Sequence, residues 1–523
     1  MGARLWGAVL AGVTGLVGAS GASGCERLDG CVNDRRALEE GRNGGEAPSL
    51  LTCMPVDAEG GGGDGGGGSG GGNGVCVPSE SDAPVNDGCG VFVSSSFGDD
   101  GNEGTKASPV KTLSRALQLA KASGLPVLAC GEAMVEEAEG IIVAGGQRIF
   151  GGLDCTAKEP NTWIFDRDKP TEVSAPTDKV PMRLEKGSGT ELSDLIIQAR
   201  DAATPAKPSI AVIASDVTAK MIRVTMKAGN GAKGVDGAPP QGDAEAGQNG
   251  SNGSGACTGS PSPGGIGPEN SCSSGGNGGN GSVKVGLNGS SGGPADGSSN
   301  YGMGASDVVS CSNGADGVVG APGMDAVAAS GLGTINAEDG HVGVSGQNGA
   351  DGAPGKGGGG GGGTRAVVNN VDGCNSGGTK GGAGGGSGAS GGCGGKGGAG
   401  GSSGGASIGL VSLQSRLSFL QSKIITGKGG EPGLGSDGQE GGLGGAMGGK
   451  GGAGNGSVNE GCKGGSGGNG GRGGRGGNGA QGYSIGIAFT EPVGMPNPLA
   501  FTQMTFEFPD ILDSLIKDKQ KFE

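Results

Sequence analysis

Two groups of acidic side chains have types and spacing that suggest chemistry. Asp99, Asp100, Asn102 and Glu103 offer the carboxylate and amide oxygens that calcium prefers. Such a short cluster more often shapes a turn, because Asp and Asn side chains accept hydrogen bonds from nearby backbone N–H groups. We therefore expect a turn here and assign no metal ligand.

The second group is Asp166 and Asp168, which flank Arg167 close to Trp163. Paired carboxylates can cleave glycosidic bonds. At this spacing within a loop they are more typical of a solvated acidic turn. We assign no catalytic residue.

Basic residues in the glycine-rich stretches suggest phosphate or RNA binding, but their surroundings do not support it. Lys356 and Lys396 each stand in Gly-Lys-Gly without the Ser or Thr of a phosphate loop. Arg472 and Arg475 lie in a segment similar to an RGG box that lacks interleaved aromatic residues. With a net charge of −15, we expect no nucleic-acid partner and no cofactor.

The N-terminus has the order of a secretory signal peptide. Arg4 precedes the apolar run 5–17, and small residues lead to Cys25. The stretch 22–25, Ala-Ser-Gly-Cys, resembles a bacterial lipobox, although Ala22 stands where Leu is usual. We expect an exported protein, either secreted or held at the outer membrane or cell surface by a lipid on Cys25, with no other membrane contact. Simple signal-peptidase cleavage is the alternative.

Cysteine number agrees with export. Without Cys25, 12 of the 13 cysteines remain, enough for six disulfides in an oxidising compartment. No CxxC pair occurs and His341 is the single histidine, so we expect no zinc site. The 12 are Cys31, Cys53, Cys76, Cys89, Cys130, Cys155, Cys257, Cys272, Cys311, Cys374, Cys393 and Cys462.

Residues 89–230 carry the signals of regular structure. Leu113, Ala116, Leu117 and Ala120 recur at helical spacing, which predicts one amphipathic helix over 112–123, ended by Gly124. Short apolar runs separated by turn residues predict an all-β sandwich, barrel or solenoid. The runs are 91–93, 126–129, 141–143, 148–150, 162–165, 182–184, 192–197, 209–214 and 221–226.

A family resemblance favours the solenoid. Val91-Phe92-Val93-Ser94, the Gly-Asp-Asp-Gly-Asn-Glu-Gly-Thr loop at 98–105, the Pro-Val-Lys-Thr-Leu stretch at 109–113 and Gly-Gly-Leu-Asp at 151–154 carry it. Together they resemble bacterial pectin-lyase-like right-handed parallel β-helix proteins with a DUF1565-type N-terminus. The resemblance implies an all-β, right-handed parallel β-helix with one N-terminal capping helix.

The chain also repeats itself without gaps. Ser209 to Ile213 recurs as Ser407 to Val411, an offset of 198 residues, and a third copy starts at Ser484. Regular recurrence of this kind predicts stacked strand pairs, with the glycine tracts leaving the scaffold between them. After Pro509, Ile511, Leu512, Leu515 and Ile516 predict a short covering helix.

The glycine tracts have a period of three, as at Gly314, Gly317, Gly320 and Gly323. This period suits an extended helix of three residues per turn. Two interpretations stay open: a disordered or loose linker, or packed polyglycine-II helices. The expected organisation is a signal peptide (1–24), a Cys/Gly-rich linker (25–88), the β-helix (89–230), a glycine-rich insertion (231–405), a returning rung (406–430), a second insertion (431–482), and a last rung with its tail (483–523).

Three classes of function fit these observations. The favoured one is a non-enzymatic envelope or surface protein with a structural, adhesive or matrix-contact role, whose partner is cell-surface polysaccharide or matrix. Its tracts resemble those of PGRS-type bacterial surface proteins. The alternatives are a β-helix polysaccharide lyase or hydrolase, and a polyglycine-II protein that binds ice or another surface.

Overall fold

The structure, a computed structural model, describes residues 76–155, 163–494 and 496–523. The predicted signal peptide, Cys25, Cys31 and Cys53 lie outside the described residues. Within the described residues, no helix is long and apolar enough to cross a membrane.

The predicted amphipathic helix is confirmed as α1 (Leu113–Ser123), which buries Leu113, Ala116, Leu117 and Ala120. Thr112 Oγ1 accepts a hydrogen bond of 3.2 Å from the backbone N–H of Arg115 and so caps the N-terminus. Gly124, with φ 73°, ends the helix in the left-handed conformation that glycine adopts without strain. α1 packs against the first strands of the fold, β1 (Val91–Val93), β2 (Val127–Cys130) and β3 (Ile141–Val143).

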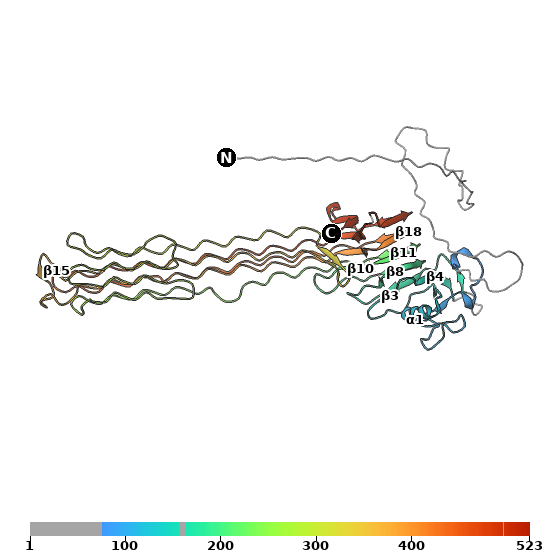
Figure 1. The fold of residues 1–523 in the computed structure, drawn as a ribbon, viewed down its shortest axis with the longest axis horizontal. Helices are drawn as coiled ribbons and strands as arrows, with labels where there is room; N and C mark the ends of the chain where they lie inside the picture. Colours follow the sequence, from blue (N-terminus) through green and yellow to red (C-terminus); the bar gives the residue numbers. More distant parts are fainter. Residues whose placement is uncertain (1–75, 156–162, 495) are drawn as a thin grey trace, which may run out of the picture. The chain divides into compact units, whose positions relative to one another are not determined.

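Most strands belong to three parallel sheets (Figure 1). The eight-stranded sheet has the order β1, β2, β4 (Arg148–Asp154), β8 (Gly187–Ser193), β11 (Val217–Ile222), β18 (Arg416–Leu420) and β21 (Leu499–Thr502), and β5 (Ile164–Phe165) pairs antiparallel with β4. The six-stranded sheet has the order β23 (Ile516–Lys521), β20 (Ser484–Phe489), β17 (Ser407–Leu413), β10 (Ser209–Ser215), β7 (Met182–Leu184) and β3. The five-stranded sheet has the order β22 (Thr505–Glu507), β19 (Lys423–Ile425), β12 (Thr225–Lys227), β9 (Leu195–Gln198) and β6 (Thr171–Ser174).

The remaining described elements are small. Two antiparallel hairpins are formed by β13 (Thr334–Asn336) with β14 (Gly340–Val342), and by β15 (Val367–Val368) with β16 (Val371–Asp372). Three single-turn 3-10 helices cover Pro78–Glu80 (η1), Asp87–Cys89 (η2) and Asp513–Leu515 (η3).

The predicted 198-residue repeat is confirmed as strand pairing. Ser209 lies opposite Ser407 in the parallel pair β10–β17, and Ser407 lies opposite Ser484 in β17–β20. The same offset pairs Met221 with Phe419. Residues that match in the sequence are therefore hydrogen-bonded neighbours in the sheets.

Two predicted strands are divided by bends. The run 192–197 breaks at Asp194 (φ 58°), and the run 221–226 breaks at Arg223 (φ 54°). Arg223 donates from Nε and Nη2 to the Asp194 carboxylate at 2.6 and 2.7 Å. This largely buried pair connects the bend between β8 and β9 with the bend between β11 and β12, whose strands are neighbours in the sheets.

The expectation of a single pectin-lyase-like right-handed parallel β-helix is wrong. The described strands lie in separate sheets of eight, six and five strands, parallel except for β5 in the largest, with two antiparallel hairpins besides. Most of the chain between β12 and β20 is also not strand: it forms a second ordered part, held by backbone hydrogen bonds between glycine-rich segments. Strand patterns alone could not predict this part, because its order depends on the absence of side chains.

This second part, which we call the glycine bundle (residues 231–405 and 428–482), consists of extended segments that lie side by side (Figure 1). Its hydrogen bonds recur at every third residue: Gly346, Gly349, Gly352 and Gly355 donate to Gly401, Gly398, Gly395 and Gly392 at 2.8–2.9 Å. Three residues per turn gives such a repeat. The tracts are therefore ordered and packed in this structure, and they are not loose loops.

The segment 357–363 at the centre of the bundle shows why so many consecutive glycines are needed. All seven N–H groups donate in turn to three other segments, 287–293, 386–389 and 312–315. Three more segments, 276–279, 302–305 and 462–465, donate to its carbonyl groups. A Cβ at Gly360 would lie 1.9 Å from the carbonyl oxygen of Asn277. A segment with neighbours on every side has no room for a side chain.

Two hydrophobic cores support the sheets. The larger lies among the three sheets and α1 and includes Phe92, Phe150 and Leu410. The second contains residues of β10, β17 and β20 such as Ile210 and Ile408, together with Phe522. Leu332 and Ile335, at the hairpin β13–β14, pack against the second core. The hairpin therefore attaches the bundle to the six-stranded sheet.

The C-terminal tail differs from the prediction. The expected helix is limited to η3, and residues 516–521 continue as β23, paired with β20. Lys517, Lys519 and Lys521 alternate along this outermost strand. Lysines of this kind discourage another chain from pairing with an exposed edge.

Candidate contact surface

The oxygen-rich stretch at 99–102 forms a turn, as expected. Asp100 Oδ1 accepts hydrogen bonds of 2.9 Å from the backbone N–H groups of Lys111 and Thr112. Asp99 accepts from Gly101, and the Asn102 amide donates to the carbonyl of Pro109 at 2.8 Å. These groups fix the loop that leads into α1.

Asp166 and Asp168 also belong to a turn, since Asp166 Oδ1 accepts a 3.0 Å hydrogen bond from the N–H of Asp168. Trp163 is 3% exposed and packs edge-on against Phe92, with ring centroids 4.9 Å apart. The tryptophan is therefore a core residue and offers no platform for a sugar ring. The geometry assembles no glycosidase pair here.

The basic residues singled out in the sequence have partners in the bundle. Lys356 is 5% exposed, forms an ion pair with Asp296 and donates to the carbonyl of Ser298 at 2.9 Å. The hydrogen bond from Lys356 holds the pKa of Asp296 well below its usual range. Arg472 and Arg475 lie 3.5 and 3.6 Å from the carboxylates of Glu440 and Asp437. Lys396 is exposed, and its backbone N–H donates to Gln439.

Within the described ranges, one group of side chains has the composition and proximity of a metal site: Cys130, Glu132 and Cys155. The two sulfurs form a disulfide. Glu132 accepts hydrogen bonds from the hydroxyl groups of Ser94, at 2.7 Å, and of Ser96. This arrangement crosslinks two strand ends and leaves no thiolate to bind a metal.

Five disulfides join the described cysteines, in part as the cysteine number predicts. They are Cys76–Cys89, Cys130–Cys155, Cys257–Cys374, Cys272–Cys393 and Cys311–Cys462. The last three crosslink the glycine bundle over separations of 117, 121 and 151 residues. So many disulfides indicate an oxidising, extracytoplasmic environment.

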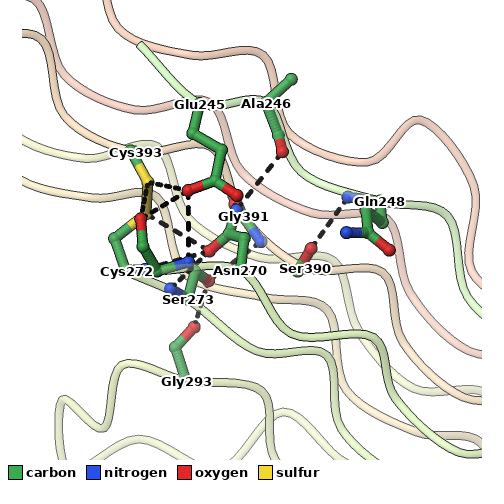
Figure 2. The surroundings of a disulfide bond; sticks show 11 residues. Glu245, Ala246, Gln248, Asn270, Cys272, Ser273, Gly293, Ser390, Gly391 and Cys393 are labelled. Atoms are coloured by element: carbon green, nitrogen blue, oxygen red, sulfur yellow. Dashed lines mark hydrogen bonds between the residues drawn. A yellow bond between two sulfur atoms is a disulfide. The ribbon is translucent and has the colours of Figure 1, made fainter.

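Figure 2 shows that polar groups around the Cys272–Cys393 disulfide form hydrogen bonds within and between neighbouring segments of the bundle. The Asn270 side chain accepts from the backbone N–H of Ser273 at 2.7 Å, and the Ser273 hydroxyl donates to the carbonyl of Gly293 at 2.7 Å. The N–H of Cys393 donates to the backbone carbonyl of Glu245 at 2.8 Å. The disulfide thus holds segments whose contacts are otherwise made by backbone and short polar side chains.

One outer segment of the bundle, residues 314–329, has far fewer neighbours than the central segment, and we call it the ridge. Gly317, Gly320 and Gly323 donate at 2.8 Å to the parallel segment 463–478. On its other side, Ala350, Ala353 and Lys356 of an antiparallel segment donate to ridge carbonyls at 2.9–3.0 Å. Apart from Ala315, whose N–H also donates to the carbonyl of Asn300, the ridge has two neighbours instead of six. Two of every three ridge residues therefore face solvent.

One of the two exposed rows of the ridge is entirely apolar. This row, with a spacing of three residues, contains Ala315, Val318, Ala321, Met324 and Val327. Val318, Met324 and Val327 are 64%, 80% and 83% exposed. The second row places Val319, 63% exposed, and Pro322 between Asp316 and Asp325. Apolar side chains gathered on one face mark an interaction surface more often than scattered ones do.

The charges on the ridge are directed away from this apolar strip. Asp316 Oδ1 accepts a 2.7 Å hydrogen bond from the N–H of Ser466, which lowers the pKa of Asp316. Asp325 accepts from the N–H of Arg475 at 2.6 Å. No Lys, Arg or Glu occurs between residues 308 and 330. The strip was missed in the sequence, although its signal, apolar residues at every third position after glycine, is visible there.

No protein-family model, curated protein or solved structure matches this chain. The resemblance noted at residues 89–230 stays a prediction.

Proposed function

We propose that this chain is a non-enzymatic, exported envelope or surface protein that makes adhesive or matrix contacts through its glycine bundle. The observation that carries the proposal is the ridge, an exposed apolar strip on a bundle that three disulfides crosslink. A rigid, disulfide-bonded bundle supports contact outside the cytoplasm better than a flexible tract, because little ordering entropy is lost on binding.

The proposed partners are cell-surface polysaccharide or matrix. The sequence supports attachment of the mature chain through a lipid on Cys25, with free secretion as the alternative. Mass spectrometry of the mature N-terminus separates the two, since a lipidated Cys25 carries the mass of an S-diacylglyceryl group, with or without an N-acyl chain.

An adhesion assay tests the proposed function. Purified, disulfide-bonded protein is coated on beads, and binding to isolated cell envelopes and extracted matrix polysaccharide is measured. We expect V318D/M324D to lower bead retention at least about tenfold, and the control I266D/V235D to leave it unchanged. Ile266 and Val235 are 77% and 55% exposed on other segments of the bundle. Equal retention of both variants would contradict a contact role for the ridge.

A second candidate function is binding to ice or another periodic solid. It is favoured by one observation, the regular spacing of Ala315, Val318, Ala321, Met324 and Val327, which corresponds to a repeat of roughly 9 Å along an extended three-residue helix. Thermal hysteresis of a protein solution tests it. Hysteresis that V318D/M324D removes would assign the ridge to ice, and no hysteresis would eliminate this candidate.

A further inference from the structure

Another glycine-rich segment cannot pack against the outer face of the ridge by backbone contact. Inside the bundle, neighbouring segments approach so closely that an added Cβ would meet backbone atoms at about 2 Å, as at Gly317 and Gly320 (1.8 and 2.0 Å). The outward rows of the ridge instead carry side chains such as Val318, Met324 and Val327. These side chains prevent backbone approach, much as charged residues protect the edge of a sheet. A partner must therefore dock on the side chains.

We propose that the partner of this strip is the same strip on a second copy of the chain, aligned along the bundle direction. The inference rests on the proposed contact role of the ridge and deepens it: the strip itself joins copies of the chain, and contacts of the bundle with polysaccharide or matrix depend on that association. The apolar side chains of the row stand at every third residue, so they can contact another row along its whole length only if that row has the same spacing. A second copy of the chain has this spacing because its sequence is identical. Pairing about a two-fold axis uses one patch on both molecules.

Charge permits this pairing on the ridge. Two copies with a net charge of −15 each repel one another over most of their surface. On the ridge and the adjoining segment, the carboxylates of Asp316 and Asp325 accept from backbone N–H groups. Arg472 and Arg475 are paired with Glu440 and Asp437. The row from Ala315 to Val327 carries no charged side chain, so the repulsion comes from charges beside it, and salt weakens it.

The area of the strip sets the expected affinity. The row from residue 315 to 327 extends about 37 Å at the rise of a three-residue helix. With Val319, Pro322, Ala350 and Ala353 at its sides, it covers roughly 500 Å². Two strips together bury about 1,000 Å², which is at the lower end for specific interfaces. The dimer is accordingly weak in solution, and closely spaced copies on one surface strengthen it through high local concentration.

Sedimentation equilibrium of the purified, disulfide-bonded chain tests the inference. We expect a monomer–dimer equilibrium with a Kd on the order of 100 μM, which tightens as salt screens the net charge. V318D/M324D weakens it at least tenfold, and the matched I266D/V235D pair leaves it unchanged. Resistance of each variant to protease reports that the bundle is folded.

A wild-type chain that stays monomeric at 1 mM overturns the inference, as does V318D/M324D dimerising like the wild type. The bead assay distinguishes this failure from failure of the proposed function. A monomeric protein whose adhesion still depends on Val318 and Met324 keeps the contact role and assigns the strip to another partner. A chain that neither dimerises nor adheres through Val318 and Met324 overturns both the inference and the proposed function.

Discussion

The carboxylate of Asp325 accepts a hydrogen bond of 2.6 Å from the backbone N–H of Arg475, 150 residues further along the chain. Asn313 and Asp316 accept from the N–H groups of Lys463 and Ser466 at the same separation of 150. Within the bundle, backbone N–H groups donate to carbonyl groups of neighbouring segments. At its surface, where one neighbouring segment is missing, Asn and Asp side chains accept the hydrogen bonds from these N–H groups instead. The spacing of these residues fixes the register between segments.

Removal of the two ridge carboxylates should loosen the ridge. We expect D316A/D325A to lower the free energy of unfolding of the bundle by about 1 kcal/mol per lost hydrogen bond, measured by limited proteolysis at increasing urea. D316N/D325N is the control, because the amide oxygen still accepts. Equal protease resistance of the Ala and Asn variants would show that these hydrogen bonds do not set the register.

Substitution of a central glycine should break the bundle. In G360A the new Cβ would meet the carbonyl oxygen of Asn277 at 1.9 Å, so we expect a loss of more than about 3 kcal/mol and rapid cleavage between β12 and β17. Gly255 gives the control, since a Cβ there has no atom nearer than 3.6 Å. If G360A and G255A resist protease equally, segment 357–363 is not enclosed.

The sequence predicted the features that a repeat or a regular spacing of residues indicates. The 198-residue offset placed Ser209 beside Ser407, and the spacing of Leu113, Ala116, Leu117 and Ala120 identified α1. The bends at Asp194 and Arg223 were not predicted, because apolar alternation continues through both of them. The fold class was wrong because strand patterns say nothing of how many sheets the strands form.

The bundle and its ridge could not be predicted from the sequence, because that requires knowing which distant segments become neighbours. A glycine at every third position is compatible with a loose linker and with a packed helix, and the difference depends on the number of neighbours. Seven consecutive glycines at 357–363 mark a segment with neighbours on all sides, whereas valine and methionine at 318 and 324 mark an outer one. The same triplet pattern, interpreted residue by residue, therefore distinguishes inside from outside.

Reduction of the bundle disulfides should expose it to protease. Cys257–Cys374, Cys272–Cys393 and Cys311–Cys462 each close a loop of more than 100 residues, and loss of such a crosslink costs about 2–5 kcal/mol. We expect residues 231–405 to resist trypsin when oxidised and to be cleaved after reduction, and C272S/C393S to show an intermediate rate. C76S/C89S, which opens a short loop outside the bundle, is the control. Resistance that survives full reduction would show that backbone packing alone holds the tracts.

Mild acid should weaken the attachment of the hairpin β13–β14. His341 is 4% exposed, and its Nε2 donates to the carbonyl of Leu332 at 2.6 Å. Burial lowers the pKa of His341 below its usual 6.5. As the pH falls below 6.5, the unfolded chain takes up a proton that the folded chain does not, so stability decreases, by at most about 1.4 kcal/mol per pH unit.

Since His341 is the single histidine, the slope of stability against pH between 5.5 and 7 reports on it. Two other charged contacts lie at the hairpin: Arg183 donates to the carbonyl of Ala337, and Lys207 pairs with Asp339. We expect urea unfolding followed at several pH values to show the slope in the wild type and to lose it in H341Q, whose amide can still donate to Leu332. A slope that persists in H341Q would place the titrating group elsewhere.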